Sequence, residues 1–597
     1  MNLLLPTLVS LMGHSVAAPP EPFDVVVLGA TPGGIMAAVA AARHGRRVLL
    51  LERGAHLGGL PANGLGATDI GTRGATGGLF TEFVARVKAH YLKAYGADSP
   101  QVKACSDGYH FEPHVAEAVL DGLLAEQPLI TVLRRRQFDA RPENVVLDGH
   151  ALVGLRVTNL DGGEIESYRG RVFIDATYEG DLAAAAGAPF TTRRESAEEY
   201  HEPRAGRLYI AWGAPQPGEG STGAGDDTIQ AYNYRLCLTT RPDRVPIEKP
   251  ADYRREDYAS LADDIVHGHF TGAGKPPEGI GWVTNQVGLP NGKTDSNNQH
   301  LSFVSTDLPE ENWPWPTADW AWRDAFARRL RDYTLGLLWF VQHDDAVPEA
   351  TRVACRRWGL AADEYVDNGH FPRQVYVREG RRIEGEYRFT AHDALPVTPG
   401  GRPPLHADSI TASHYALDSH AHHKRESGRV HLDGFFSYPT RPYTVPYGVM
   451  VPRGVENLLT PVPASATHVG FSTLRMEPCW MALGQAAGSA AALALEDGTN
   501  VRAVSRPRLQ ERLLADGAVL QYYEDARPGE RGWHGLQVLG LRGLIPGWRA
   551  ELGHVVSEAD ARAWIVAAGG RTPDAYRPGA TTRGELLEAL LPLSNRR

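Results

Sequence analysis

Residues 23–52 alternate short apolar runs with a helical pattern. FDVVVL (23–28) is rich in Val, as is typical of a parallel strand buried on both faces. A glycine cluster follows, and the next stretch, IMAAVAAARH, favours a helix that ends at Gly45. A second apolar run, RVLLLE, then ends on Glu52. This order of strand, glycine turn, helix and strand predicts a βαβ unit of a parallel sheet.

The glycine turn of this unit is suited to a dinucleotide. Gly29 lets the chain turn sharply out of the strand, and Gly33 and Gly34 let the helix begin close to a ligand. The helix N-terminus would hold a pyrophosphate, while Glu52 would accept hydrogen bonds from ribose hydroxyls. Thr31 stands where the G-x-G-x-x-G pattern has its middle glycine. We predict a dinucleotide site, the alternative being a βαβ unit without a ligand.

Later glycine pairs indicate which dinucleotide is bound. Gly58 and Gly59 begin six residues beyond Glu52, and another pair follows at 77–78. This spacing resembles FAD-binding proteins of the glutathione-reductase type. In those proteins the acid binds the adenosine ribose, and the glycine-rich segment lets the backbone approach the flavin side of the cofactor.

Two further segments complete the predicted flavin domain. RVFIDATYEGDLAAAAG (171–187) has the pattern of another strand and helix of the same sheet. Within 456–495 a strand breaks into a small-residue turn that carries His468 and Arg475, and Pro478 then opens a long Ala/Gly helix. The helix N-terminus and the arginine would stabilise the N1/C2=O edge of the flavin, which becomes anionic on reduction.

FAD is therefore the predicted cofactor. The residues expected to contact it lie in the glycine turn, at strand ends and at the start of the long helix: Gly29, Thr31, Pro32, Gly33, Gly34, Glu52, Arg53, Gly58, Gly59, Asp175, Ala176, Met476 and Glu477. Some fumarate-reductase-like flavoproteins attach FAD through a histidine shortly before a glycine pair. Residues 72–76 contain no histidine, so we expect non-covalent FAD.

Several spaced motifs resemble one family, the bacterial FAD-dependent oxidoreductases, which are often exported. The resemblance runs from about residue 23 to residue 500, and THVGFSTLRMEPCWMALGQAAG (467–488) is also similar to the flavin-site segment of fumarate reductases. It implies FAD and redox chemistry but no particular substrate. The other motifs are LGATPGGIMAAVAAARHG, FIDATYEGDLA, IQAYNYRLCLT, LPNGKTDSNN, VYVREGRRIEGEY, DSHAHH and RPYTVPYGVMVP.

The predicted fold class is α/β. A discontinuous Rossmann-like FAD-binding domain would carry an inserted α+β substrate or cap domain and a small helical C-terminal domain. Residues 156–170 of the first part predict a hairpin. The expected divisions are a leader (1–20), the FAD-binding domain in two parts (23–190 and 441–498), the cap domain (191–440) and the C-terminal domain (499–597).

The two ends of the chain bear on its location. The apolar leader is followed by small residues from Ser15 to Ala18, which predicts a signal peptide and export; the alternatives are a disordered leader or a start codon placed too far upstream. GWHGLQVLGLRGLIPGW and ATTRGELLEALL in the C-terminal domain are similar to a surface-layer homology module, which would associate with the cell wall. The alternative is a helical domain packed on the enzyme.

Composition excludes other classes of function. The 61 Lys and Arg against 71 Asp and Glu give a net charge of −10, without a basic stripe, so we expect no nucleic-acid partner. The four cysteines lie more than a hundred residues apart and form no zinc or iron–sulfur pattern. No other segment reaches about 18 uninterrupted apolar residues, so no membrane span is expected.

A flavin dehydrogenase needs a base for the proton that accompanies the hydride, and histidine suits that role near neutral pH. HYALDSHAHHKRE supplies His414, His420, His422 and His423. These histidines have three interpretations: His420 or His422 lies at the active site, the segment is an exposed polar loop, or it forms a metal site. Only Asp418 nearby could complete a ligand set, and we expect no metal. His420 is the predicted base.

Four other residues complete the predicted site. His468 and Arg475 would support reduced flavin or a substrate carboxylate. Asn298 and Tyr447 would position the substrate, although adjacent asparagines also suit turns and a tyrosine also fills interfaces. Gly448 stands where the family resemblance leads us to expect an arginine.

Two motifs receive structural interpretations. VYVREGRRIEGEY (375–387) predicts an ion-pair network between domains rather than a catalytic array. ENWPWPTADWAWRDAF (311–326) carries four tryptophans that could stack on sugars, but packing at the start of a helix capped by Thr317 is preferred.

These residues together predict a FAD-dependent oxidoreductase that dehydrogenates a C–H bond next to a heteroatom in a small polar or saccharide-like substrate. Hydride would pass to flavin N5, and O2 or a diffusible acceptor would reoxidise the flavin. One alternative is a reductase of an activated C=C bond, as in fumarate reductases. Another is a glycan-binding wall protein in which flavin does not turn over.

Overall fold

The structure, a computed structural model, describes residues 21–272 and 274–594. The predicted leader at 1–20 lies outside the described residues, so export stays a prediction. Within the described ranges, no helix is both long and apolar enough to cross a membrane.

A mostly parallel sheet forms the centre of the molecule. β1 (Phe23–Leu28) pairs in parallel with β2 (Val48–Leu51) on one side and β7 (Ile165–Asp175) on the other, and β3 (Ile130–Leu133) extends the sheet beyond β2. β18 (Leu458–Leu459) comes much later in the chain yet pairs in parallel with β7. The last four residues of β1 and all of β2 are buried and apolar, because the helix at 32–43 packs on one face and residues 152–157 and 182–186 pack on the other. The sheet is thus built from two separate stretches of the chain, as predicted.

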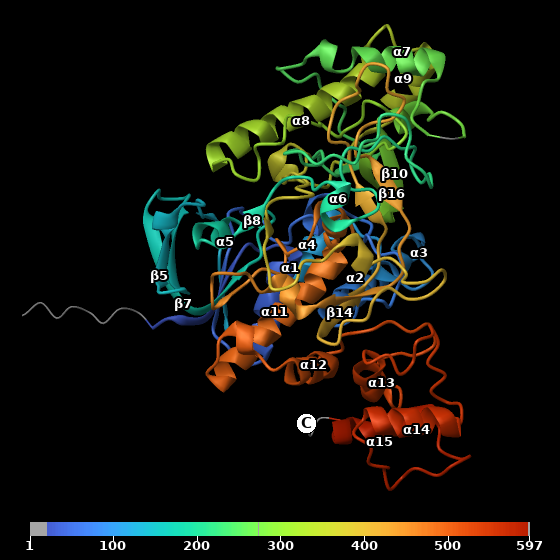
Figure 1. Cartoon of the computed structure of the whole chain (residues 1–597). Helices are drawn as coiled ribbons and strands as arrows, with labels where there is room; N and C mark the ends of the chain where they lie inside the picture. Colours follow the sequence, from blue (N-terminus) through green and yellow to red (C-terminus); the bar gives the residue numbers. More distant parts are fainter. Residues whose placement is uncertain (1–20, 273, 595–597) are drawn as a thin grey trace, which may run out of the picture.

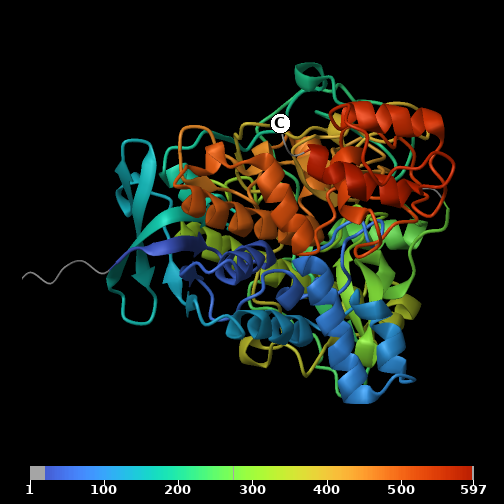
Figure 2. The same ribbon diagram turned by 90° about the horizontal axis from the view of Figure 1, so that it is seen from below.

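The long strand β7 also belongs to an antiparallel extension. It pairs with β6 (Ala151–Asn159), which pairs in turn with β4 (Arg136–Gln137) and β5 (Val145–Asp148). Figures 1 and 2 show this extension projecting from one side of the molecule. The hairpin predicted over 156–170 is confirmed by the β6–β7 pairing.

Two small-residue helices cross the centre together. α1 (Pro32–Arg43) and α11 (Glu477–Asp497) pack in contact, which Figure 1 shows near the middle of the view. A Cβ on Gly484 would lie 2.0 Å from the Gly33 carbonyl oxygen, and one on Gly488 would lie 2.2 Å from that of Ala37. Glycine at both positions is therefore what lets α11 approach the start of α1 so closely.

Other helices complete this part of the fold. α2 (Leu79–Tyr95) and α4 (Pro113–Ala125) pack against each other, and α1 contacts α4. Shorter helices are α3 (Pro100–Ala104), α5 (Asp181–Ala185), α6 (Ala197–Tyr200) and α10 (His468–Leu474).

The middle of the chain forms a cap built on a second sheet. Its strands are antiparallel in the order β10 (Thr284–Leu289), β11 (Lys293–Asn298), β9 (Leu236–Thr239) and β12 (Gly359–Leu360). Figure 1 places the cap helices above the central sheet; they are α7 (Ala259–His267), α8 (Trp320–His343) and α9 (Glu349–Arg356). Two-stranded pairs link the parts: β8 (Phe190–Thr191) with β13 (Arg382–Ile383), β14 (Ser409–Ser413) with β17 (Tyr443–Pro446), and β15 (Leu417–Ser419) with β16 (Phe436–Tyr438).

The long helix α8 begins two residues later than its predicted cap. Asp319, rather than Thr317, is the N-cap, because its carboxylate accepts a hydrogen bond of 2.9 Å from the Trp322 N–H. Aspartate and threonine both cap helices well, so the sequence alone did not distinguish the two positions.

The C-terminal region is helical and has its own apolar core. It contains α12 (Arg506–Ala515), α13 (Trp533–Gly540), α14 (Glu558–Ala567) and α15 (Arg583–Ser594). Trp533, Trp564 and Leu587 are among the buried residues that hold the last three helices together. Figures 1 and 2 show these helices at one end of the molecule. The α/β core, cap and helical C-terminal region together confirm the predicted fold class.

Candidate functional site

The turn after β1 is tight, and its glycines leave no room for side chains, as the sequence predicts. Gly29 has φ +93°, and a Cβ there would lie 2.9 Å from the carbonyl carbon of Ala176. A Cβ on Gly34 would lie 1.9 Å from the Gly29 carbonyl oxygen. Thr31, in place of the middle glycine, caps α1: its hydroxyl accepts from the Gly34 N–H at 3.2 Å and donates to the Ala176 carbonyl at 2.8 Å. The helix N-terminus therefore begins at the sheet edge, as a pyrophosphate site requires.

Glu52 occupies the position predicted for the ribose contact. Its carboxylate accepts hydrogen bonds from the N–H groups of Ala30 (2.8 Å) and Gly54 (2.7 Å), and burial raises its pKa. Two cavities of about 180 and 80 Å³ adjoin it. Both cavities are lined by Glu52, Arg53, Glu179, Trp320 and Gln374. These cavities lie where the sequence predicts the adenosine end of the dinucleotide site.

Cap residues close that end from above. Arg53 of the sheet domain pairs with Asp324 of α8 at 2.8 Å, and its guanidinium lies 4.0 Å from the ring centre of Trp320. Trp315, whose indole N–H donates to Glu179, also lines the larger cavity. The tryptophan motif thus packs at the start of α8, as preferred, and contributes part of the cavity wall.

Both carboxylate oxygens of Asp175 accept hydrogen bonds from the protein itself. One carboxylate oxygen accepts from the N–H and hydroxyl of Thr177, and the other accepts from the N–H of Ala183 in α5. Burial raises the pKa of Asp175 to about 6. Asp175 therefore fixes the turn whose next residue, Ala176, binds Thr31.

The expected flavin end contains polar atoms that the protein leaves unused. Glu477, in the first turn of α11, accepts a 2.5 Å hydrogen bond from the Tyr178 hydroxyl, and that hydroxyl would lie 2.4 Å from a Cβ on Gly59. Among the described residues, the other carboxyl oxygen of Glu477 and the indole nitrogen of Trp480 have no hydrogen-bond partner although both are buried. Burial raises the pKa of Glu477 to about 8. A tight glycine segment beside an unused donor and acceptor fits FAD, whose ring system has polar edges.

Beyond this end lies a group of buried charges that we call the arginine–aspartate cluster. Its members come from seven separate segments: Asp69, Arg235, Asp295, Asp307, Tyr376, Arg378, Asp418, His420 and Arg475. Asp69 and Asp418 keep 17% and 14% of their side-chain surface exposed, so one side of the cluster reaches solvent, and we call that side the recess.

Arg475 connects the cluster to the start of α11. Its guanidinium donates to the Tyr376 hydroxyl at 3.0 Å and to the carboxylate of Asp418 at 3.2 Å. Arg235 makes a bidentate pair with Asp295, with distances of 2.8 and 2.5 Å. Asp295 also accepts from the N–H groups of Gly66 and Ala67, so the cap holds the glycine-rich segment of the first domain in place.

His420 is oriented by a carboxylate on one side. Its Nδ1 lies 2.7 Å from Asp307, whose other oxygen lies 3.0 Å from Arg378. Its Nε2 lies 3.8 Å from the carboxylate of Asp418. This arrangement fixes the ring and its tautomer, and it places Nε2 on the side of the recess.

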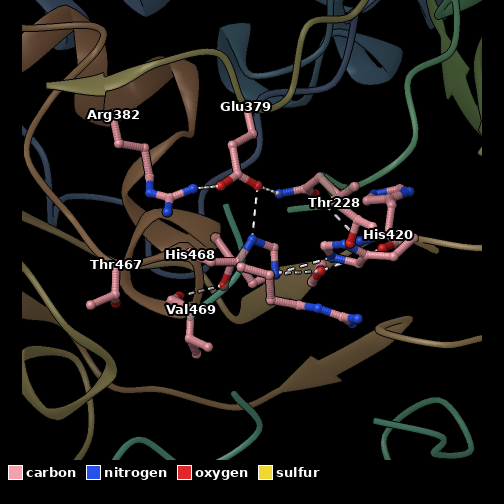
Figure 3. A network of polar contacts seen from close by, with 12 residues as sticks. Thr228, Glu379, Arg382, His420, Thr467, His468 and Val469 are labelled. Atoms are coloured by element: carbon pink, nitrogen blue, oxygen red, sulfur yellow. Dashed lines mark hydrogen bonds and ion pairs between the residues drawn. The ribbon is translucent and has the colours of Figure 1, made fainter. Parts of the chain in front are cut away.

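His468 lies behind the cluster in a second network, shown in Figure 3. Its Nδ1 lies 2.8 Å from Glu379, and its Nε2 lies 3.2 Å from the Ser419 hydroxyl and 3.3 Å from His422. Although burial alone would raise the pKa of Glu379, His468 and Arg382 lower it to about 2. Both ring nitrogens of His468 are thus engaged within the protein.

Asn298 and Tyr447 lie apart from the residues that meet at the recess. The Tyr447 hydroxyl donates to the Val501 carbonyl at 2.8 Å. Side chains alternate along β11, so Asp295 and Asn297 share the face that contacts the cluster and Asn298 lies on the other. Of the predicted catalytic residues, the structure brings His420 and Arg475 together.

Sequence reasoning missed most partners of those two residues. Asp69 and Asp307 lie in loops without a periodic pattern, and no motif pointed to them. Tyr376 and Arg378 had a signal, because both belong to the arginine-rich motif at 375–387. The rest of that motif forms the predicted ion pairs, with Arg381 bound to Asp181 at 2.6 Å.

Aromatic side chains form a wall beside His420. The Phe435 ring centre lies 5.5 Å from that of His420 and 5.2 Å from that of Trp212. Trp212 in turn lies 4.9 Å from His300, whose pKa is lowered by burial. The recess is therefore bounded by charges on one side and by apolar rings on the other.

Comparisons with known proteins identify the family. The model of the FAD dependent oxidoreductase family matches residues 24–513. No curated protein matches the chain.

Among solved structures, the glycerol-3-phosphate dehydrogenase from Bacillus halodurans complexed with FAD is 10% identical over 29% of this chain and 38% of its own, with a TM-score of 0.20. The flavin-dependent monooxygenase PieE is 19% identical over 30% and 34%, with a TM-score of 0.20. A myxobacterial FAD-dependent chondrochloren halogenase is 20% identical over 37% and 49%, with a TM-score of 0.22. The chain spans less than half the length of each. The family match covers most of this chain, which belongs to the FAD-dependent oxidoreductases and uses FAD as its cofactor.

Proposed function

We propose that the protein dehydrogenates a C–H bond next to a heteroatom in a neutral, polar, saccharide-like substrate. The observation that carries the proposal is the 2.7 Å contact between His420 and Asp307 at the edge of the recess. Bound FAD supplies the hydride acceptor and is reoxidised by O2 or a diffusible acceptor. The FAD is held non-covalently in this proposal, by the glycine turn, Glu52 and the start of α11.

His420 would take the proton of the substrate hydroxyl or amine. Asp307 accepts the hydrogen bond of Nδ1–H, so the lone pair of Nε2 is available to the substrate. As the C–H bond breaks, two electrons leave with the hydride and the proton passes to Nε2. Asp418, 3.8 Å from Nε2, then stabilises the imidazolium that forms. The carbon is left double-bonded to its heteroatom.

The charge balance of the cluster favours a neutral substrate. Each arginine is already paired: Arg235 with Asp295 and Asp69, Arg378 with Asp307, and Arg475 with Asp418. Four carboxylates thus face three guanidinium groups, which leaves no surplus positive charge for a substrate carboxylate. Hydroxyl or amine groups can instead hydrogen-bond to these ion pairs.

The test is anaerobic reduction of the bound flavin by pools of sugars, polyols, amino acids and hydroxy acids, followed by its visible absorbance. We expect one pool of neutral compounds to bleach the flavin. His420→Gln should slow that reduction by about 10²- to 10⁴-fold, because the proton then has no positioned acceptor.

His423→Gln is the matched control. It makes the same substitution in the same segment, but His423 contacts Asp433 outside the cluster, and we expect little change in the reduction rate. Equal rates for the two variants would contradict the role of His420. If no pool bleaches the flavin but an activated alkene oxidises the reduced flavin, the protein is a C=C reductase and the proposal is wrong.

A further inference from the structure

A second cleft lies between the C-terminal region and the core. It has a volume of about 760 Å³. Tyr522 and Trp548 of the C-terminal region form one side, and Tyr438 stands on the side of the core. Thr72 and His414 of the core also line it. Residues of both the C-terminal region and the core therefore form the cleft.

A short stretch of chain, residues 414–418, leads from the wall of this cleft to the arginine–aspartate cluster. His414, in the cleft wall, lies 2.7 Å from the Thr72 hydroxyl, and the next residue is Tyr415. Thr440, also in the cleft wall, donates to the Tyr415 carbonyl at 2.5 Å. Asp69 and then burial raise the pKa of the Tyr415 hydroxyl well above its usual value, with Asp418 adding to the effect. Tyr415 thus lies on the chain between His414 of the cleft wall and Asp418 of the arginine–aspartate cluster.

The aromatic rings of the cleft are held in place by arginines. The Arg204 guanidinium lies 4.4 Å from the ring centre of Tyr438. That of Arg402 lies 4.1 Å from the ring centre of Trp548, whose indole N–H donates to the Gly400 carbonyl at 3.4 Å. Four prolines stiffen the same walls. The rings are therefore fixed before a ligand arrives, which reduces the entropy lost on binding.

The residues that line the cleft are balanced in charge, and the two arginines stacked on its rings donate to backbone carbonyls. Of the described residues that line it, Arg441 and Glu524 carry opposite full charges. Burial, and then the charge of Arg441, lower the pKa of His414, which stays neutral at pH 7. A ligand for this surface must combine apolar faces for the rings with hydroxyl groups for the polar side chains. Sugar rings have both, since their C–H faces pack on aromatic rings and their hydroxyls point outward.

We propose that this cleft binds a neutral oligosaccharide, whose terminal unit reaches the recess while the other units lie on Tyr438, Tyr522 and Trp548. The link to the recess rests on the proposed function, but binding in the cleft does not depend on turnover. The cleft would then set the preference for chain length.

The first experiment measures binding alone. The full-length holoprotein is applied to a glycan array that carries neutral and uronic-acid-containing oligosaccharides, and the best neutral hit of about six units is titrated by calorimetry. We expect Tyr522→Ala and Trp548→Ala each to weaken binding by about tenfold. Melting temperatures establish that both variants fold, and Tyr438→Ala, on the core side, replaces either that does not.

Tyr576→Ala is the matched control. Tyr522 and Tyr576 are both partly buried against the same apolar core of the C-terminal region, but Tyr576 lies outside the cleft. We expect the control to bind like the parent protein. No binding of neutral glycans, binding of acidic glycans only, or equal loss in Tyr522→Ala and Tyr576→Ala would each overturn the proposal.

Kinetics separate this proposal from the proposed function. If a saccharide reduces the flavin, the cleft variants should raise KM for the six-unit chain by about tenfold with kcat unchanged, and leave both constants for the single sugar as they were. If no saccharide reduces the flavin but binding still falls only in the cleft variants, the glycan site stands and the proposed reaction does not.

Discussion

Glu477 shows at the scale of one residue how the fold prepares for a cofactor. Its side chain is buried at the start of α11, with one oxygen bound to Tyr178 and the other without a partner among the described residues. Burial raises its pKa to about 8, so the carboxyl is protonated at pH 7 and can donate a hydrogen bond. A protonated acid here avoids a buried negative charge.

This carboxyl should make stability depend on pH. Its pKa rises from an ordinary 4.5 to about 8 on folding, so between these values the folded protein holds a proton that the unfolded chain has lost. The free energy of unfolding must therefore fall as pH rises from about 4.5 to 8. We expect Glu477→Gln, which stays neutral, to show a smaller fall in melting temperature over that range. Parallel curves for the two proteins would show that the carboxyl is ionised.

Individual residues also show what sequence can and cannot predict about the site. His420 and Arg475 were found because each stands in a motif with a defined neighbourhood. Asp307 was not, because a single polar residue in a loop has no pattern, and only folding brings it to its partner. Tyr447 and Asn298 had the right chemistry, but the direction of a side chain depends on packing and strand register.

Among the elements, the contact between α1 and α11 controls the cofactor turn. α11 reaches the backbone of Gly33 only because Gly484 has no side chain, and Gly33 belongs to the turn that would hold the pyrophosphate. This contact joins segments that are far apart in sequence. Both helices are rich in small residues, which permits close packing, but their identity as partners follows from the sheet order.

We expect Gly484→Ala to destabilise the protein by about 1–3 kcal/mol, because its Cβ would lie 2.0 Å from a backbone atom that cannot move aside cheaply. FAD should also be lost more readily, as measured by flavin fluorescence after dilution. Gly122→Ala in α4 is the control: nothing lies within 4 Å of its Cβ, and the change should stabilise by about 0.5–1 kcal/mol. A stable, FAD-saturated Gly484→Ala protein would contradict the close approach.

The elements themselves were largely predictable. The unit from β1 to β2 and the β6–β7 hairpin follow from apolar periodicity and turn residues, which are local signals. The cap was not predictable in detail, because its strands are short and two of them are largely polar: β10 reads TNQVGL and β11 reads KTDSNN. Its pairing with β9 is decided by contacts over long sequence separations.

At the scale of the whole molecule, the cap is joined to the sheet domain by buried ion pairs. Arg323 of α8 binds Asp181 of α5 with distances of 2.6 and 2.9 Å, and Arg381 binds the same carboxylate. The Arg323 side chain is only 1% exposed. Burial of these charges makes the arrangement specific, since a partner lost from the group leaves an uncompensated charge.

Arg323→Leu should therefore destabilise the protein by about 3–5 kcal/mol, reduced to the extent that Arg381 still neutralises Asp181. Denaturant unfolding followed by circular dichroism and flavin fluorescence checks both stability and FAD retention. Arg328→Leu makes the same change at an exposed position of α8 and should alter stability by less than about 0.5 kcal/mol. Equal effects of the two substitutions would show that the buried pair does not hold the cap.

The start of α8 has a consequence for how the protein acquires and keeps its cofactor. Trp320 and Asp324 of the cap and Glu52 and Arg53 of the sheet domain line the cavity where adenosine is predicted to bind. With adenosine between these two parts, we expect FAD to enter and leave only when they move apart. The rate of FAD loss after dilution would then measure how often the cap and the sheet domain separate.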